Sequence, residues 1–370
     1  MKRTGIMVSV LVLALLCTGC GKLTKINELT AQGNEAYKQG KYQQAIDAYN
    51  QVLELDEDRE LIYNNRGMAY METGSFAQAA ADFTEAIGRN PEEDVYYNNR
   101  GLAYLGLKEY EKAETDFSEA IRLRQEASYY VSRANARKNL GDTERALEDY
   151  SAALALSPGN LKALNNRGAL YFAQENYEAA IKDYTAALQQ QDLTPEDELT
   201  LYWNRAEAER MLESYETAAR DYQTYLEKKG EEDGEALEHL AQCQAAQQLL
   251  EEAAATYSRL LMAEPDRLSA HQGRADAYYQ LEQYAEAAED YSVLLTAEPD
   301  FINYAFRGHC YYQLGQYDQA LEDLTASIEL NDQYAWAYYI RSSVYKEKKE
   351  YKLARADLTK AIELEKQAEE

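Results

Sequence analysis

The sequence predicts an all-α fold, a solenoid of about ten helix–turn–helix repeats. Ala, Glu, Leu, Gln and Lys dominate its composition, while Val and Thr are thinly spread, which favours helices over strands. One alanine also recurs ten times along the 370 residues, at steps of 33 to 38. The recurring alanines are Ala45, Ala79, Ala113, Ala146, Ala180, Ala218, Ala253, Ala287, Ala320 and Ala354.

Each repeat carries further residues in the same register. A Gly, Ala or Ser lies twelve residues before each alanine, and an aromatic residue lies four residues after it in eight of the ten repeats. Small residues let two helices approach, and aromatic rings fill the space beside them. Most of the excess of Tyr (33, against six Phe) is therefore expected to serve repeat packing. One such stripe, expected to pack between helices, is Tyr42, Tyr110, Tyr177, Tyr215, Tyr284, Tyr317 and Tyr351.

Arginine and aspartate appear and disappear together in the repeats. The eight pairs, each separated by sixteen residues, are Arg66 and Asp82, Arg100 and Asp116, Arg133 and Asp149, Arg167 and Asp183, Arg205 and Asp221, Arg274 and Asp290, Arg307 and Asp323, and Arg341 and Asp357. The two repeats without the arginine have Gln32 and Leu240 there, and they also lack the aspartate. A ligand-binding arginine would not need this partner, so each pair is expected to be a structural ion pair between two helices.

This pattern resembles the tetratricopeptide repeat, and the resemblance extends over residues 26–368. It implies a right-handed α-solenoid whose first helices line a concave groove. About four extra residues near 189–197, followed by a charged junction at 228–235, are expected to divide the array into 26–198 and 199–370.

Asparagines recur at positions that, in proteins with these repeats, face or border the groove. They are Asn34, Asn64, Asn65, Asn98, Asn99, Asn135, Asn165 and Asn166. Such amides can pair with the backbone of an extended peptide, or they can solvate the groove and cap local backbone. The carboxylate-clamp members of the family are similar at Asn34 and Asn65. Their cations are replaced here by Thr30, Val95 and Asn99, which excludes the clamp.

Aromatic residues mark the same register in the last three repeats. Tyr279, Tyr312, Trp336 and Tyr339 are candidate anchors for a partner helix or a sugar ring, and repeat packing is the alternative.

The N-terminus has the pattern of an export signal. Lys2 and Arg3 precede a short apolar run that ends in "CTGC", too short to span a bilayer as a retained anchor. The ending resembles a bacterial lipoprotein signal, although Cys17 departs from the usual Leu. The resemblance implies removal of residues 1–19, lipidation of Cys20, a short tether over 20–25, and a membrane anchor at the extracytoplasmic face. Cys243 and Cys310 then remain, and both are expected to be buried thiols.

Charge and motif content narrow the function. A net charge of −27 disfavours nucleic acid and anionic lipid surfaces as partners. The three histidines lack metal-ligand spacing, and neither catalytic nor cofactor motifs are found, so no metal, cofactor or enzymatic activity is expected. The leading hypothesis is a lipid-anchored adaptor that binds a peptide segment or helix of an envelope protein. The alternatives are a carbohydrate- or wall-fragment-binding protein that uses the C-terminal aromatics, and an intracellular co-chaperone that retains its N-terminus.

Overall fold

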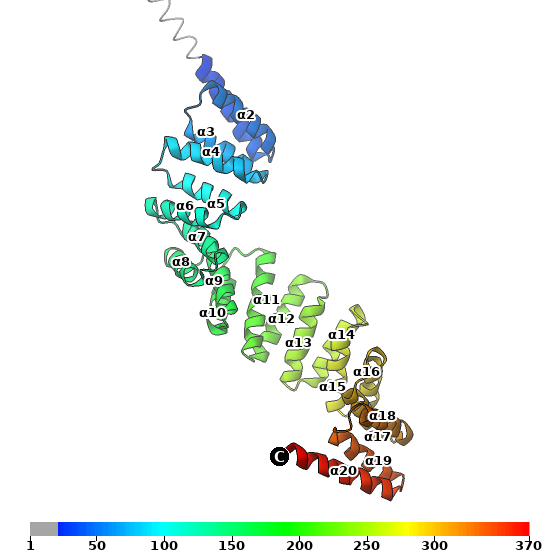
Figure 1. The fold of residues 1–370 in the computed structure, drawn as a ribbon. Coiled ribbons are helices and arrows are strands. Elements are labelled where there is room, and N and C mark those ends of the chain that lie inside the picture. The colour runs from blue at the N-terminus through cyan, green and yellow to red at the C-terminus, as the bar shows by residue number, and fades with distance from the viewer. Residues whose placement is uncertain (1–20, 370) are drawn as a thin grey trace, which may run out of the picture. The chain divides into compact units, whose positions relative to one another are not determined.

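The computed structural model describes residues 21–369, and this part of the chain is helical throughout, with no strand (Figure 1). A helix over 21–38 is followed by nineteen more. They are α2 (Tyr42–Leu55), α3 (Glu60–Glu72), α4 (Phe76–Arg89), α5 (Asp94–Gly106), α6 (Tyr110–Leu123), α7 (Ala127–Asn139), α8 (Thr143–Leu156), α9 (Leu161–Ala173), α10 (Tyr177–Leu188), α11 (Pro195–Met211), α12 (Tyr215–Lys229), α13 (Gly234–Ala246), α14 (Leu250–Ala263), α15 (Leu268–Gln280), α16 (Tyr284–Ala297), α17 (Phe301–Gln313), α18 (Tyr317–Leu330), α19 (Ala335–Glu347) and α20 (Tyr351–Glu369). The predicted all-α solenoid is confirmed.

Helices pair as the repeat register requires. The two helices of one repeat pack together, as α5 does with α6, and the second helix of that repeat then packs against the first helix of the next, as α6 does with α7. The recurring alanines lie between the paired helices, and nine of the ten are fully buried. Each helix pair therefore completes its core only against its neighbours in the array.

Small and aromatic residues meet inside each repeat. A Cβ atom added to Gly101 would lie 2.7 Å from a ring carbon of Phe117, so only the missing side chain allows this close approach. The fully buried tyrosines, Tyr150 and Tyr291 among them, hold the same position as Phe117. The predicted stripe from Tyr42 to Tyr351 is only half-buried. Tyr351 departs furthest, with 64% of its surface exposed, because none of the described helices follows α20.

The turn inside each repeat has one fixed conformation. The second residue after the end of the first helix adopts a left-handed backbone in all ten repeats, with glycine in only four of them, as at Gly74 (φ 71°). The other six carry residues such as Lys108 (φ 61°), which are strained there relative to glycine. The helix packing therefore imposes the turn even where the local sequence does not favour it.

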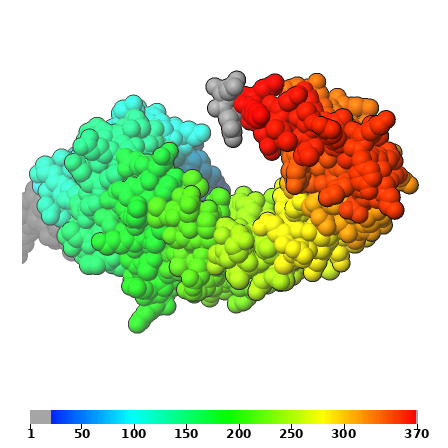
Figure 2. Space-filling view, turned by 90° about the horizontal axis from the view of Figure 1, so that it is seen from below, coloured from blue at the N-terminus to red at the C-terminus, as the bar shows by residue number. Residues whose placement is uncertain are grey.

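The chain divides into two compact units, whose described residues are 21–174 and 175–369. The division falls between α9 and α10, earlier than the expected boundary at 198/199. The extra residues near 189–197 lie inside the second unit, where α10 and α11 pack together across them. Thr194 and Asp197 form a capping box that begins α11 there. Figure 2 shows that the helices of the second unit, from green through yellow to red, follow a bend.

The predicted lipidation site at Cys20 and the signal over 1–19 lie outside the described residues. Residues 21–25 continue directly into the helix that ends at 38, so the part of the expected tether that the structure describes is helical. Among residues 21–369, no helix combines the length and the apolar character needed to cross a bilayer.

Candidate functional site

The arginine–aspartate pairs join the two helices of a repeat through two parallel hydrogen bonds. Arg66 donates from Nε and Nη2 to the two carboxylate oxygens of Asp82 at 2.7 and 2.6 Å. Asp82 is 5% exposed, and its hydrogen bonds raise the pKa of Arg66. The same contact joins Arg100 to Asp116, Arg133 to Asp149, Arg205 to Asp221, Arg274 to Asp290, Arg307 to Asp323, and Arg341 to Asp357.

In the eighth pair, Arg167 belongs to the first unit and Asp183 to the second. The ion pair between these two residues therefore stays a prediction.

Each arginine also reaches a third helix. Nη1 of Arg66 donates to Oδ1 of Asn50 at 2.6 Å, on the second helix of the preceding repeat. The equivalent acceptors for the other seven arginines are Thr84, Ser118, Ser151, Thr185, Ser258, Ser292 and Thr325. These acceptors are not among the residues predicted from the sequence, although they share one register position. In the repeat before Leu240, the acceptor position holds Gln223, and the next repeat has Leu240 in place of the arginine.

Tyrosine rings flank the guanidinium groups. The guanidinium carbon of Arg66 lies 5.6 Å from the ring centre of Tyr63 and 5.9 Å from that of Tyr70, three residues before and four after it on the helix. Rings on both sides are also present at Arg100, Arg307 and Arg341. Cation–π contacts of this kind stabilise partly desolvated cations. They account for a further part of the tyrosine excess.

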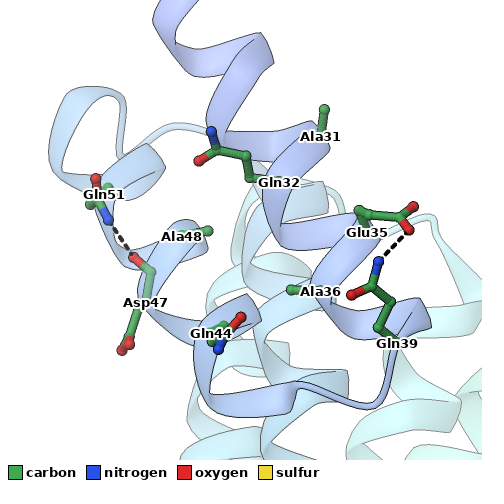
Figure 3. A pocket seen from close by; sticks show the side chains of 9 residues that line it. All are labelled: Ala31, Gln32, Glu35, Ala36, Gln39, Gln44, Asp47, Ala48 and Gln51. Carbon is green, nitrogen blue, oxygen red and sulfur yellow. Dashed lines mark hydrogen bonds between the residues drawn. The ribbon is translucent and has the colours of Figure 1, made fainter.

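Gln32 replaces the arginine in the repeat formed by residues 26–55. Figure 3 shows it beside a hollow of about 640 Å³ on the outer face of that repeat. The wall mixes polar side chains with Ala31, Ala36 and Ala48. Gln39 donates to Glu35 at 2.7 Å, and Gln51 donates to the carbonyl oxygen of Asp47 at 3.3 Å. In the described part of the chain no helix precedes this repeat, so an arginine in place of Gln32 would lack the acceptor that a preceding repeat supplies elsewhere.

Leu240 replaces the other arginine, and a different charged network lies beside it. The carboxylate of Glu207 pairs with Nδ1 of His239 at 2.7 Å and with Nη2 of Arg210 at 2.7 Å, and it accepts the hydroxyl of Tyr222. Although burial raises the pKa of Glu207, these hydrogen bonds lower it to about 2. The four side chains come from α11, α12 and α13, so they tie the junction where the arginine is missing.

Glu209, which lies on α11 with Glu207, is a buried carboxyl group whose surroundings disfavour its charged form. It is 8% exposed, and its Oε2 atom has no hydrogen-bond partner among the described residues. Burial, together with repulsion from Asp221, raises its pKa to about 7.

The predicted asparagines form hydrogen-bonded links between successive first helices of the first unit. Asn99 donates to Asn64 at 2.9 Å, and Asn65 donates to Asn34 at 3.4 Å. Asn166 donates in the same way to Asn135 at 3.2 Å.

Burial separates the asparagines further. Asn64 is only 8% exposed, because Asn99 and Met68 contact its amide, and its role in ligand binding stays a prediction. Asn34 is exposed, while Asn98 and Asn165 are half-buried. The asparagine row therefore ties neighbouring helices and leaves only part of its amide surface to a ligand.

A pocket of about 200 Å³ opens beside two of these asparagines. Its lining residues are Asn34, Tyr37, Lys38, Tyr49, Asn65 and Met68, from the helix over 21–38, α2 and α3. The hydroxyl of Tyr49 donates to Asn34 at 2.8 Å and so orients that amide. Lys38 and Tyr37 follow Asn34 at helical spacing, a signal from which they could have been predicted. The pocket combines an amide pair, one cation and an apolar side formed by aromatic and thioether groups.

Three of the four predicted aromatic anchors meet around His309 in the second unit. The ring centres of Tyr279 and Trp336 each lie 5.5 Å from that of His309, and Tyr312 lies 6.2 Å away. The hydroxyl of Tyr279 lies 2.7 Å from Nδ1 of His309, whose pKa is lowered by burial. These rings are half-buried and partly serve packing, whereas Tyr339 is 53% exposed.

Two cysteines remain in the described part of the chain. Cys243 and Cys310 are buried free thiols as predicted, and burial raises the pKa of each to about 12. Over residues 21–369, no three His, Cys, Asp or Glu side chains cluster closely enough to hold a metal ion.

Comparison with known sequences gives the same repeat. Models described as "TPR repeat" or "Tetratricopeptide repeat" match residues 33–74, 61–93, 92–157, 131–198, 204–267, 251–300, 304–334 and 337–367. The chain belongs to the tetratricopeptide repeat (TPR) family.

A solved TPR structure resembles the chain in fold. The C-terminal part of a TPR repeat-containing protein from Cytophaga hutchinsonii is 17% identical and matches with a TM-score of 0.52, covering 63% of this chain and 94% of that one. PilF of Pseudomonas aeruginosa is 16% identical, with a TM-score of 0.49 and coverage of 61% and 99%.

A curated relative matches only a short segment. Serine/threonine-protein phosphatase 5 of Mus musculus is 30% identical over 105 residues, which is 28% of this chain and 20% of the phosphatase. The chain thus spans a fifth of the length of this relative. The family and its fold suit protein–protein interaction.

Each arginine and its aspartate should contribute to stability as a pair, so that their single substitutions are not additive. Arg100→Ala should lower the free energy of unfolding by about 3–5 kcal/mol, because it leaves the buried Asp116 without its cation. Asp116→Ala combined with it should cost at least about 1 kcal/mol less than the sum of the single changes. Chemical denaturation of the four variants measures this. Asn98→Ala, on the same helix, is the control and should cost distinctly less than Arg100→Ala; additive losses would contradict the pairing.

Glu209 should make stability depend on pH. Because its pKa is raised when folded, its contribution is fully present below the unfolded value of 4.5 and is lost as pH rises toward about 7. Glu209→Gln removes that loss. The variant should match the wild type near pH 4 and exceed it at pH 8 by on the order of 3 kcal/mol. Denaturation at both pH values tests this, and an equal difference at the two would contradict it.

Proposed function

We propose that this TPR protein is an exported, lipid-anchored adaptor that holds a peptide segment of an envelope protein. The observation that carries the binding proposal is the pocket lined by Asn34, Lys38, Asn65 and Met68. Its amides can pair with peptide backbone, while Tyr37 and Met68 can accept an apolar side chain. Lys38 adds one cation, which favours an acidic or carbonyl-rich segment.

Exposed apolar side chains on the first helices of the same unit favour a peptide over a small molecule. Leu61 is 60% exposed, and Met68 and Leu102 are each 36% exposed, on first helices α3 and α5 of the same unit. Side chains of this kind, spaced along successive helices, offer several shallow contacts to an extended or helical segment.

The anchor belongs to the same proposal and rests on the sequence at Thr18-Gly19-Cys20. The helical course of residues 21–25 sets a rise of only about 1.5 Å per residue after Cys20. A lipid on Cys20 would therefore keep the helix over 21–38, and the pocket that it lines, close to the membrane surface.

A second candidate, carbohydrate binding, draws support from the aromatic cluster in the second unit. Tyr279, Tyr312 and Trp336 gather around His309, and Gln313 lies 3.0 Å from the Nε2 atom of that histidine. Aromatic faces next to amide groups are able to stack on and hydrogen-bond sugar rings.

Lipidation is tested by changing one cysteine at a time. Cys20→Ser should move the protein from the membrane to the soluble fraction and abolish incorporation of labelled fatty acid in the native host. Cys17→Ser is the matched control and should leave both unchanged. Membrane retention of Cys20→Ser would sink the anchor proposal.

Peptide binding is tested by photocrosslinking in intact cells. A photoreactive residue at Lys38 should capture a discrete envelope protein, and Met68→Ala in the same chain should reduce capture at least fivefold by removing a pocket wall. The control position is Leu156, which is 49% exposed but outside the pocket, and it should not capture that protein. If capture survives Met68→Ala and is lost with Trp336→Ala, the aromatic cluster is the binding site instead.

A further inference from the structure

Helix α20 presents an uncovered apolar face. Leu353, Leu358 and Ile362 are 47%, 40% and 43% exposed, and Tyr351, at the start of the helix, is 64% exposed. The opposite side of the helix packs on α19, where Leu364 and Ala361 join Tyr338 in a small buried cluster. Tyr351, Leu358 and Ile362 thus lie on the side where a further repeat would pack, whereas Leu353 points about 140–180° away from Leu358 and Ile362 around the helix.

The equivalent positions show what normally covers this face. Tyr291 and Phe117 correspond to Leu358, and both are fully buried. Leu53 and Leu261 correspond to Ile362 and are 9% and 7% exposed. In those repeats the following first helix supplies the cover. Leu358 and Ile362 are therefore shaped for contact with another helix.

Leu353 adds an observation that the repeat pattern does not explain. The corresponding residues in other repeats include Lys112, Arg145 and Glu286, all exposed and charged. A leucine at this position serves no packing inside the repeat, because 47% of it stays in solvent. Leu353 is therefore a separate exposed apolar side chain and is not part of the face formed by Leu358 and Ile362.

Charge along α20 is divided between its two halves. Exposed Lys352 and Arg355 lie in the first half, and the second half carries exposed Glu363 and Glu365 together with one exposed cation, Lys366. An antiparallel pair of these helices, centred between Leu358 and Ile362, would bring Arg355 near Glu365 of the other copy. A parallel pair in register would instead bring like charges together, which disfavours it.

We propose that α20 pairs antiparallel with α20 of a second copy of this chain. The contact is isologous: Leu358 of each copy packs on Ile362 of the other, flanked by Arg355–Glu365 ion pairs on both sides. Helix axes at roughly 8–10 Å allow this packing.

A single helix pair makes a small interface. Stable complexes bury about 1,200–2,000 Å², so the dimer is expected to be weak and to depend on concentration. Confinement of both copies to one membrane would raise their effective concentration, and the dimer would then carry two peptide pockets.

Sedimentation equilibrium of the full chain in detergent, over a hundredfold concentration range, tests the pairing. The wild type should shift from one to two chains. Leu358→Glu with Ile362→Glu should raise the dissociation constant at least tenfold. Met262→Glu, at an 82% exposed site, is the control and should leave it unchanged. A wild type that stays monomeric throughout, or an equal effect of the control, would overturn the proposal.

A charge exchange tests the antiparallel arrangement without touching the apolar residues. Arg355→Glu should weaken the dimer at least threefold, and adding Glu365→Arg should restore it. Both side chains are exposed, so the fold should be unaffected, and circular dichroism and thermal melting check this. Failure of the second change to rescue the first would overturn the antiparallel pairing.

Discussion

The arginine that recurs in eight of the ten repeats makes the contact on which the array depends most. One guanidinium holds the aspartate of its own repeat with two hydrogen bonds, and it reaches a hydroxyl or amide on the preceding repeat with a third. It thereby fixes three helices at one point. Tyrosine rings on the same helix shield the charge from water, which strengthens all three hydrogen bonds. Because this arginine contact recurs along the chain, it sets the spacing of neighbouring helices within each of the two compact units.

The two repeats without the arginine show how the array changes where this contact is absent. Leu240 joins an apolar core, and Glu207, His239 and Arg210 form a separate network at the same junction. Polar side chains and alanines line the hollow beside Gln32, whereas α20 at the other end of the described chain exposes leucines. The repeats at the two ends of the described chain and at this junction therefore differ in their side-chain contacts, while the other repeats share the arginine contact.

Packing of the repeats uses many groups that could otherwise bind a ligand. Asn64 and Asn99 satisfy each other, and Tyr150 donates to Asn135. What remains accessible is specific to particular repeats: the pocket beside Lys38, the exposed Tyr339, and the outer face of α20. A surface assembled from such residues can change partner without changing the fold, because the packing residues lie at other register positions.

The sequence alone determined the fold class, the repeat register and the arginine–aspartate pairing, because each of these recurs at fixed spacing and depends on neighbouring repeats only. Tertiary structure decided which residues stay accessible. Asn64 and Asn98 hold the same repeat position, yet Asn64 is buried, with Asn99 of the next first helix donating to its amide oxygen, while Asn98 is only half-buried. The boundary between units at 174 and the pocket beside Lys38 likewise follow from packing between helices that the repeat pattern does not distinguish. Whether a side chain is buried depends on the helices that cover it, and the residue type at one position does not determine this.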